Sequence, residues 1–565
     1  MDENDGRDAP PDLTPYARPS IREDHIRLPR TGQTVTSMVV DVVVNNTDTN
    51  LQNTDTFGDS ETNIAINPAN TNEIVITAFS GSWGTNSPLW HSTDGGNTWT
   101  KRFTIPVPPL ASGTGGCPCD QSVDYGRGNR MSGTFLSFSP TDVYSGTTTN
   151  PAAAAAWGWF TLAGTAQRTN STAIGNTDQP WLLINRDPFT SSQDNVYVAY
   201  DDFTISPRGM RVAVAAGSNP PNFTTDNLAG FGPTGTINPG HRLAIDPTTG
   251  TVYNLFQQIV TSNGDVSRNI NYMLNRSTDG GNTWTLNGSG TGILIANADS
   301  TQPTAKFGTV NALLGGVDHA AVDPTNGDVY YVYGNRDIGT GNNRLSIKRL
   351  TANGTGGLTI GPAAFVTGQV QAAIPSVAVT SNGVVGVFFY TFDGIVSGFP
   401  QFTAHLATSI DHGLTFPTDT ILETFLSSAT DNANTRQRVL GDYQQVKAVG
   451  NSFYGSFTGN GVPFGRTISN HDPIFFKVTI TSPGVSVSGR VSISGGRGLH
   501  NAFVILTDGL GVARRVITNP FGYYRFVNVQ AGATYTISVA SKRYQFTPRV
   551  INVTDNLTDV DFFSN

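Results

Sequence analysis

The sequence predicts an all-β protein: a six- or seven-bladed β-propeller, with seven blades favoured, followed by a small immunoglobulin-like or transthyretin-like β-sandwich. Three observations predict this fold. Charged residues make up only 13% of the 565 residues, whereas Gly (62) and Pro (32) are abundant, which is typical of strands joined by tight turns. Two motifs recur along residues 37–482. After them come short apolar stretches at close, regular spacing.

The first 36 residues are polar and contain several prolines, so we expect them to form an arm ahead of the repeats. Residues Met1–Asp5 have neither the basic nor the apolar region of a signal peptide, so none is predicted in this chain. The stretch Ser37–Val44 is apolar and as long as a strand. We expect it to pair with the last sheet of the repeat region and so close a ring.

The first repeated motif is an apolar strand, a polar turn and a second strand rich in aromatic and β-branched residues. Its clearest copies are Ala65–Phe79, Ala244–Phe256 and Ala321–Tyr333. Each turn opens with Asn-Pro or Asp-Pro, in which Pro fixes φ and the Asx side chain bonds nearby backbone. Each copy is therefore predicted to be a β-hairpin. Looser copies are expected at Leu183–Tyr200, Ala378–Tyr390 and Ala448–Phe457.

The second motif reads Ser-x-Asp-x-Gly-x-Thr followed by Trp or Phe, at Ser92–Trp99, Ser277–Trp284 and Ser409–Phe416. Its Asp can accept N–H bonds inside a turn, its Gly permits a positive φ, and its aromatic ring can pack between sheets. Three copies of one motif cannot share one active site, so we expect their Asp residues to be structural. These are Asp94, Asp279 and Asp411.

The spacing of the repeats predicts the number of blades. The intervals between the three Ser-x-Asp motifs fit three and two units of about 62–66 residues. With one degenerate unit near residues 116–165, the repeat region holds about seven units, although six longer ones also fit. Repeated four-stranded sheets close into a propeller because closure protects their edges. The predicted domains are residues 1–36, 37–482 and 483–565, with a hinge at Ser482–Gly484.

The C-terminal region changes character. It contains about seven short apolar stretches separated by Gly and Pro, the pattern of a small β-sandwich. The predicted strands are Val485–Ile493, Ala502–Asp508, Arg514–Thr518, Tyr523–Val529, Tyr535–Val539, Val550–Val553 and Val560–Phe563.

Composition excludes several classes of partner. The net charge is −8 and no run of Lys or Arg is present, so nucleic acid is not an expected partner. No apolar stretch approaches the roughly 18 residues of a membrane-spanning helix. Cys117 and Cys119 are the only cysteines, and they are expected to be two loop thiols or one local bridge. No cofactor is predicted, although the many oxygen ligands would suit a structural Ca²⁺.

The Ser-x-Asp-x-Gly-x-Thr-aromatic motif resembles the Asp-box, or BNR repeat, and residues 37–482 resemble bacterial exported propellers of the sialidase-like group. The segments Glu61–Pro68, Asp178–Trp181 and Gly441–Tyr443 add to this resemblance. It implies a protein that is secreted or displayed on the cell surface. The C-terminal region resembles the carboxypeptidase regulatory-like domain, a non-catalytic sandwich, through Val487–Val491, Asn501–Thr507, Thr518–Phe526 and Tyr544–Pro548.

A propeller binds ligands where its innermost strands start, at one end of the axis. Polar residues recur just before nearly every predicted inner strand, so they are expected to converge there. The alternative is that they bond backbone and water in the channel. The residues are Glu61, Asp120, Gln121, Asp178, Gln179, His241, Arg242, Asp318, His319, Asp442 and Tyr443, with Arg436 and Arg438 just upstream of the last pair.

The sialidase resemblance implies roles for these residues. Arginines would clamp a substrate carboxylate, a Tyr activated by a Glu would attack the anomeric carbon, and an Asp would supply acid–base catalysis. The family's aromatic-Arg-Ile-Pro string is absent, and Arg27–Pro29 is the nearest match. The implied clamp is Arg242, Arg336 and Arg438, helped by His241 and His319; the nucleophile pair is Tyr443 with Glu61; and the acid is Asp120, Asp178 or Asp318.

Two functions therefore stay open. The first is a secreted sialidase-like propeller that binds glycans at its axial mouth and either hydrolyses them as an exo-glycosidase or only binds them. The second is a structural or adhesive surface protein, a subunit of an extracellular assembly or a homo-oligomer, that makes contacts through its N-terminal arm or its C-terminal sandwich.

Overall fold

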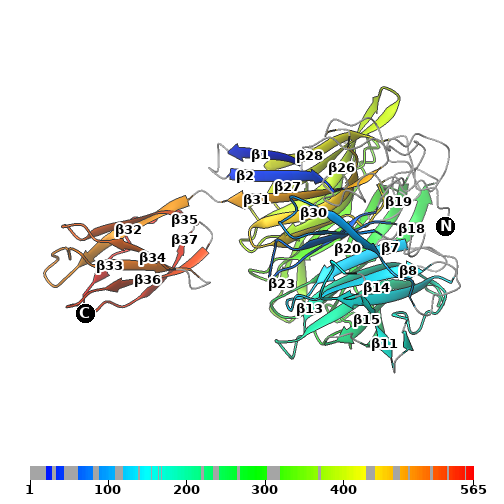
Figure 1. The fold of residues 1–565 in the computed structure, drawn as a ribbon, viewed down its shortest axis with the longest axis horizontal. Coiled ribbons are helices and arrows are strands. Elements are labelled where there is room, and N and C mark those ends of the chain that lie inside the picture. The colour runs from blue at the N-terminus through cyan, green and yellow to red at the C-terminus, as the bar shows by residue number, and fades with distance from the viewer. Residues whose placement is uncertain are drawn as a thin grey trace. The chain divides into compact units, whose positions relative to one another are not determined.

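The computed structural model confirms an all-β chain, and no α-helix occurs in the segments it describes (Figure 1). None of these segments forms a helix long and apolar enough to cross a membrane. The described residues are 21–27, 34–42, 61–79, 88–108, 119–137, 140–153, 156–162, 165–166, 168–217, 222–232, 241–263, 267–301, 318–366, 371–427, 440–461, 463, 471–481, 484–508, 513–530, 533–553 and 555–564.

Six antiparallel sheets of four strands follow one another along the described chain, and each is one blade. Each predicted hairpin forms the two inner strands of a blade, and the degenerate unit near residues 116–165 forms the second blade. A short pair, β11 (Thr161–Leu162) and β12 (Thr165–Ala166), follows the second blade.

The first three blades are β3 (Asn63–Ile66), β4 (Ile74–Thr77), β5 (Pro88–Ser92) and β6 (Thr100–Thr104); β7 (Cys119–Tyr125), β8 (Met131–Ser137), β9 (Asp142–Thr148) and β10 (Gly158–Trp159); and β13 (Thr177–Arg186), β14 (Asp194–Asp202), β15 (Gly209–Ala216) and β16 (Phe223–Phe231). The next three are β17 (Arg242–Ile245), β18 (Val252–Asn263), β19 (Ser267–Ser277) and β20 (Ile293–Thr301); β21 (Asp318–Val322), β22 (Val329–Gly334), β23 (Leu345–Ala352) and β24 (Leu358–Phe365); and β25 (Ala372–Val379), β26 (Val385–Val396), β27 (Phe399–Ser409) and β28 (Thr418–Leu426).

The seventh sheet closes the ring. It orders β29 (Gln445–Val449), β30 (Ser452–Gly459), β31 (Asp472–Thr481), β2 (Thr34–Asp41) and β1 (Ile21–Arg27). The strand expected at 37–44 thus pairs with the last sheet, as predicted. The inner strands then pack in a closed circle, in the order β3, β7, β13, β17, β21, β25, β29 and back to β3. The propeller therefore has seven blades.

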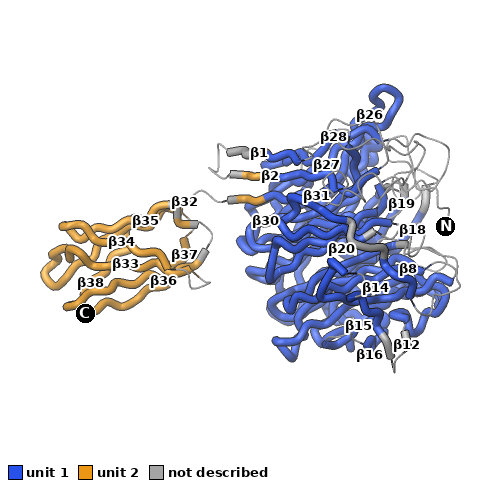
Figure 2. Tube along the Cα trace, viewed as in Figure 1, with its two compact units in different colours: residues 1–23, 37–478 blue, residues 24–36, 479–565 orange. Residues whose placement is uncertain are grey.

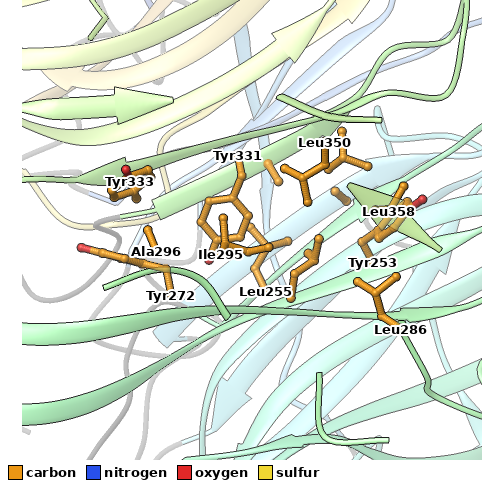
Figure 3. Close-up of a cluster of buried hydrophobic side chains, with 14 of the residues drawn as sticks. Tyr253, Leu255, Tyr272, Leu286, Ile295, Ala296, Tyr331, Tyr333, Leu350 and Leu358 are labelled. Atoms are coloured by element: carbon orange, nitrogen blue, oxygen red, sulfur yellow. The ribbon is translucent and has the colours of Figure 1, made fainter. Parts of the chain in front are cut away.

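Blades are held together by apolar side chains that fill the space between neighbouring sheets. Between the fourth and fifth blades, Tyr253, Leu255 and Tyr272 pack with Tyr331 and Leu350 (Figure 3). These side chains come from strands whose residues alternate between the two faces of a sheet, so each sheet contributes one face to each gap. Burial of such large side chains stabilises the ring by about 1.5–3 kcal/mol for each fully buried side chain.

The three Ser-x-Asp motifs form the same turn. In the fourth blade, Asp279 Oδ1 accepts the Thr283 N–H at 2.9 Å, and its Oδ2 accepts the Thr283 hydroxyl at 2.6 Å. Ser277 donates its hydroxyl to Asp279 Oδ1 at 2.9 Å and accepts the Gly281 N–H at 2.8 Å. The same bonds recur around Asp94 and Asp411. The three carboxylates are therefore structural, as expected.

The chain falls into two compact units, residues 1–23 with 37–478 and residues 24–36 with 479–565 (Figure 2). In the second unit, seven strands form two sheets around a core that includes Val487, Leu506, Phe526 and Ile537. All seven predicted strands are present. They are β32 (Gly484–Ser492), β33 (Phe503–Thr507), β34 (Ala513–Ile517), β35 (Tyr523–Gln530), β36 (Ala533–Ala540), β37 (Arg549–Val553) and β38 (Phe562–Phe563).

Candidate functional site at the start of the inner strands

The inner strands carry a recurring distortion near their first residues. Asp120, Gln179 and Ile374 have φ values of 46°, 53° and 54°, each where the pairing with the second strand shifts register. Glu61, two residues before β3, has a φ of 54°. A bulge of this kind redirects side chains, and positive φ in residues other than Gly concentrates at functional sites.

Arg242, the first residue of β17, lies at the centre of the cluster that these strands build. Its guanidinium lies 4.3 Å from the ring centroid of Trp181 and 5.0 Å from that of Tyr443, and the two rings stack 5.6 Å apart. It donates to the backbone oxygens of Asp442, at 2.7 Å, and His241, at 2.9 Å. Arg242 is only 1% exposed. Its charge therefore acts in a medium that screens little.

Gln179 connects this arginine to the bulge of the third blade. Its side-chain oxygen accepts a bond from Arg242 Nη1 at 3.2 Å. The Asp442 carboxylate lies 3.5 Å from Arg242 Nη2, so the seventh blade contributes an anion as well as a backbone oxygen. One guanidinium thus joins the starts of three inner strands.

Several buried carboxylates surround Arg242. Burial raises the pKa of Asp201 well above its usual value, and Arg242 opposes that rise. Burial likewise raises the pKa of Asp318 to about 6, although hydrogen bonds from Tyr331 and Gln257 and the charge of Arg242 act to lower it. Tyr331 donates to Asp318 at 2.5 Å and Gln257 at 2.6 Å. A carboxyl with this pKa can hold or release a proton near pH 6.

The two histidines of the cluster are neutral at neutral pH. Burial, together with the charge of Arg242, lowers the pKa of His241 to about 4 and that of His319 to about 3. His241 bonds Asn254 through Nε2, and its Nδ1 lies 3.5 Å from Asp201. His319 packs edge-on against Trp181, with ring centroids 5.9 Å apart.

Tyr443 is fully buried, and its hydroxyl has no hydrogen-bond partner among the described residues. Burial raises its pKa well above the usual value, and the charges of Asp120, Asp442 and Asp178 raise it further while Arg242 lowers it. The phenol is therefore protonated at neutral pH. Glu61 packs against Gly441, where a Cβ would overlap the Glu61 side chain.

The structure thus brings most of the sequence-predicted residues to one end of the propeller axis. Electrostatic interactions connect seven of them there: Tyr443, Asp120, Asp178, Asp318, Arg242, His241 and His319. Glu61 lies beside Gly441. Arg336 instead follows β22 and lines a small recess with Gly334 and Pro375. Arg438 and Cys117 lie outside the described residues, and the Cys119 side chain is not described.

Sequence reasoning assigned no role to Trp181, Asp201 or Asn254. Asp201 lies on the second strand of its blade, directly opposite Asp178 in the β13–β14 register. The predicted hairpin, Leu183–Tyr200, ends just before Asp201, and the register shift between Asp178 and Trp181 sets this pairing, so the sequence pattern did not reveal it. Among the described residues, no group of three His, Cys, Asp or Glu side chains is arranged to hold a metal ion.

The chain matches no family model and no curated protein. It is similar to solved β-propellers of lectins and glycosidases. The BP39L lectin of Burkholderia pseudomallei is 12% identical, with a TM-score of 0.41 over 72% of this chain and 94% of the lectin. The six-bladed Aleuria aurantia lectin, which recognises fucose, is 12% identical, with a TM-score of 0.37 over 65% of this chain and 95% of that one.

An α-L-arabinanase of Penicillium chrysogenum is 11% identical, with a TM-score of 0.33 over 61% of this chain and 89% of the enzyme. Overlaps of this size reflect the common arrangement of strands in blades. They say nothing about which ligand this chain binds.

Proposed function

We propose that the propeller binds glycans at the cluster around Arg242. The observation that carries the proposal is the packing of Arg242 against the stacked rings of Trp181 and Tyr443, with carboxyl groups around it. Aromatic rings pack on the C–H faces of sugars, and carboxylates accept bonds from sugar hydroxyls. A guanidinium also pairs with the carboxylate of an acidic sugar through two parallel bonds.

The finer proposal is that the cluster hydrolyses glycosides in the manner of an exo-sialidase, in a protein that is secreted or displayed on the cell surface. Asp318, with a pKa of about 6, would protonate the leaving group. Tyr443 would be the nucleophile. Because its pKa is raised, it needs a base as it attacks, and Asp120, Asp442 and Asp178 are the carboxyl groups whose charges act on it.

The variant Tyr443→Phe tests both proposals, glycan binding and glycoside hydrolysis. It removes a hydroxyl without a partner among the described residues and keeps the ring that stacks on Arg242. We expect it to retain glycan binding on an array and by calorimetry, and to slow glycoside release by roughly 10²–10⁴-fold. Tyr390→Phe is the matched control, because the Tyr390 hydroxyl bonds Thr458, outside the Arg242 stack.

Absence of binding to every sialylated and neutral glycan would refute the proposal as a whole. Binding by the parent protein with no release of sugar would remove only the hydrolytic part.

A structural or adhesive role is the second candidate, favoured by the surface of the C-terminal unit. Phe521, Val550 and Phe563 are each about 70% exposed there. Exposed apolar side chains of this size suit contact with another protein or another copy of the chain. The strand β2, by contrast, is already paired within its own chain. Light scattering distinguishes this candidate, because a strict monomer would contradict self-assembly.

A further inference from the structure

A separate cavity of about 410 Å³ runs along the propeller axis beyond the Arg242 stack. All seven inner strands contribute to it, and it extends toward the turns that follow them, at Pro68, Pro247 and Pro324. Its volume is in the range of small-molecule sites. The walls are largely aliphatic and include Leu183, Ala244, Val322, Val377, Ala378 and Val446.

The charged side chains of this cavity already have partners. Lys447 donates to Asp124 at 2.5 Å and to the Val123 backbone oxygen at 3.1 Å. Arg127 pairs with Asp194 at 2.5 Å, and Arg186 donates to the Thr248 backbone oxygen at 2.5 Å. A charged ligand would have to compete with these pairs and lose its own hydration in an apolar channel. The cavity therefore favours an uncharged occupant.

Four buried side-chain atoms of the lining have no hydrogen-bond partner among the described residues: Tyr125 Oη, Arg186 Nε, His319 Nε2 and Gln445 Oε1. His319 and Gln445 are 5% and 4% exposed as whole residues. His319 Nδ1 accepts the Val377 N–H at 3.2 Å, so in the neutral ring the proton lies on Nε2. Of these four, His319 offers a donor and Gln445 an acceptor. A hydroxyl group is both an acceptor and a donor.

We propose that the axial cavity binds a small uncharged molecule with an apolar body and one hydroxyl group. The aliphatic walls hold the body, and the hydroxyl bonds His319 Nε2 and Gln445 Oε1. Leaving these two groups unpaired costs free energy that such a ligand recovers. The site is distinct from the Arg242 stack, which His319 touches through Trp181. It takes an apolar alcohol rather than a glycan.

Calorimetry and saturation-transfer NMR on the full chain test the proposal, with n-hexanol, hexanoate and hexylamine as probes. We expect saturable binding of n-hexanol and at least tenfold weaker binding of the two charged probes. Gln445→Leu replaces the acceptor by an apolar side chain of similar size, so it should weaken n-hexanol binding by roughly 3- to 10-fold. Gln258→Leu is the control, since Gln258 bonds the Phe231 backbone oxygen outside the cavity.

Ala378→Leu adds volume to the cavity wall and should abolish n-hexanol binding without affecting glycan binding. No binding of n-hexanol to the parent protein, equal binding of hexanoate, or full binding by both Ala378→Leu and Gln445→Leu would each overturn the proposal. Glycan binding is measured on the same samples. If the parent protein binds n-hexanol but binds no glycan, the proposed function is refuted and the alcohol site is supported.

Discussion

At the residue scale, the candidate site shows what a sequence can and cannot reveal. Asp318 and His319 were predictable because they are the first two residues of an apolar strand in a recognisable repeat. The positive φ of Glu61 and Asp120 was not, because it depends on tertiary contacts. Glu61, for example, packs on Gly441, which lies far away in the sequence. Local propensity does not encode such a contact.

Asp318 also determines part of the pH dependence of stability. Its pKa in the folded state, about 6, exceeds its ordinary value of 3.8, so between these two pH values the folded state binds a proton that the unfolded state has released. This contribution to stability is complete below pH 4 and is lost as pH rises through about 6. In the parent protein, this decrease in the free energy of unfolding amounts to about 1–3 kcal/mol. We expect Asp318→Asn to abolish it, because Asn does not titrate. Urea unfolding between pH 4 and 7 measures the difference in slope.

Asp279→Asn is the comparison for this measurement. Burial opposes the shift, but hydrogen bonds from Thr283 and Ser277 lower the pKa of Asp279 overall. Its contribution is therefore lost only as pH falls below about 4. Identical slopes for Asp318→Asn and the parent protein between pH 4 and 7 would contradict the assigned proton.

At the element scale, the Ser-x-Asp turns connect each blade that carries one to the blade before it. Trp99 of the first blade lies 5.3 Å from Phe475 of the seventh, and Trp284 of the fourth packs with Tyr197 and Val214 of the third. The sequence predicts the turn, because its bonds are local. It also predicts that the aromatic ring packs between sheets. It does not reveal which side of the blade the ring covers, since that depends on the twist of the sheets.

Two glycines of these turns give a matched test. Gly281 and Gly413 have φ values of 85° and 77°, so Ala adds similar backbone strain at both. A Cβ at Gly281 would overlap Val214 Cγ2, whereas the nearest atom at Gly413 is a Tyr330 ring carbon at 3.2 Å. We expect Gly281→Ala to cost about 1–2 kcal/mol more than Gly413→Ala. Chemical denaturation measures both, and equal losses would show that packing against the preceding blade is unimportant.

At the scale of the whole molecule, the ring is held closed by a strand from the opposite end of the chain. Val39 and Val40 of β2 are almost fully buried, and the Val42 N–H donates to the Pro473 backbone oxygen at 3.1 Å. Val40 packs with Ile64, Ile76 and Trp90 of the first blade. The strand thus joins the last blade by hydrogen bonds and the first by apolar contact, which makes the seven sheets one cooperative ring.

A chain that starts at residue 43 should therefore lose more stability than its length suggests. Without β2, the strand β31 becomes an edge with unpaired N–H and C=O groups, and the apolar residues of the first blade are exposed. We expect the midpoint of thermal unfolding to fall by at least about 5 °C and aggregation to increase. Calorimetry and light scattering measure these changes. A chain that ends at residue 483 is the control: it keeps β2, and the core it loses consists only of residues from the C-terminal unit. If both truncations lower the midpoint equally, closure by β2 is not what stabilises the ring.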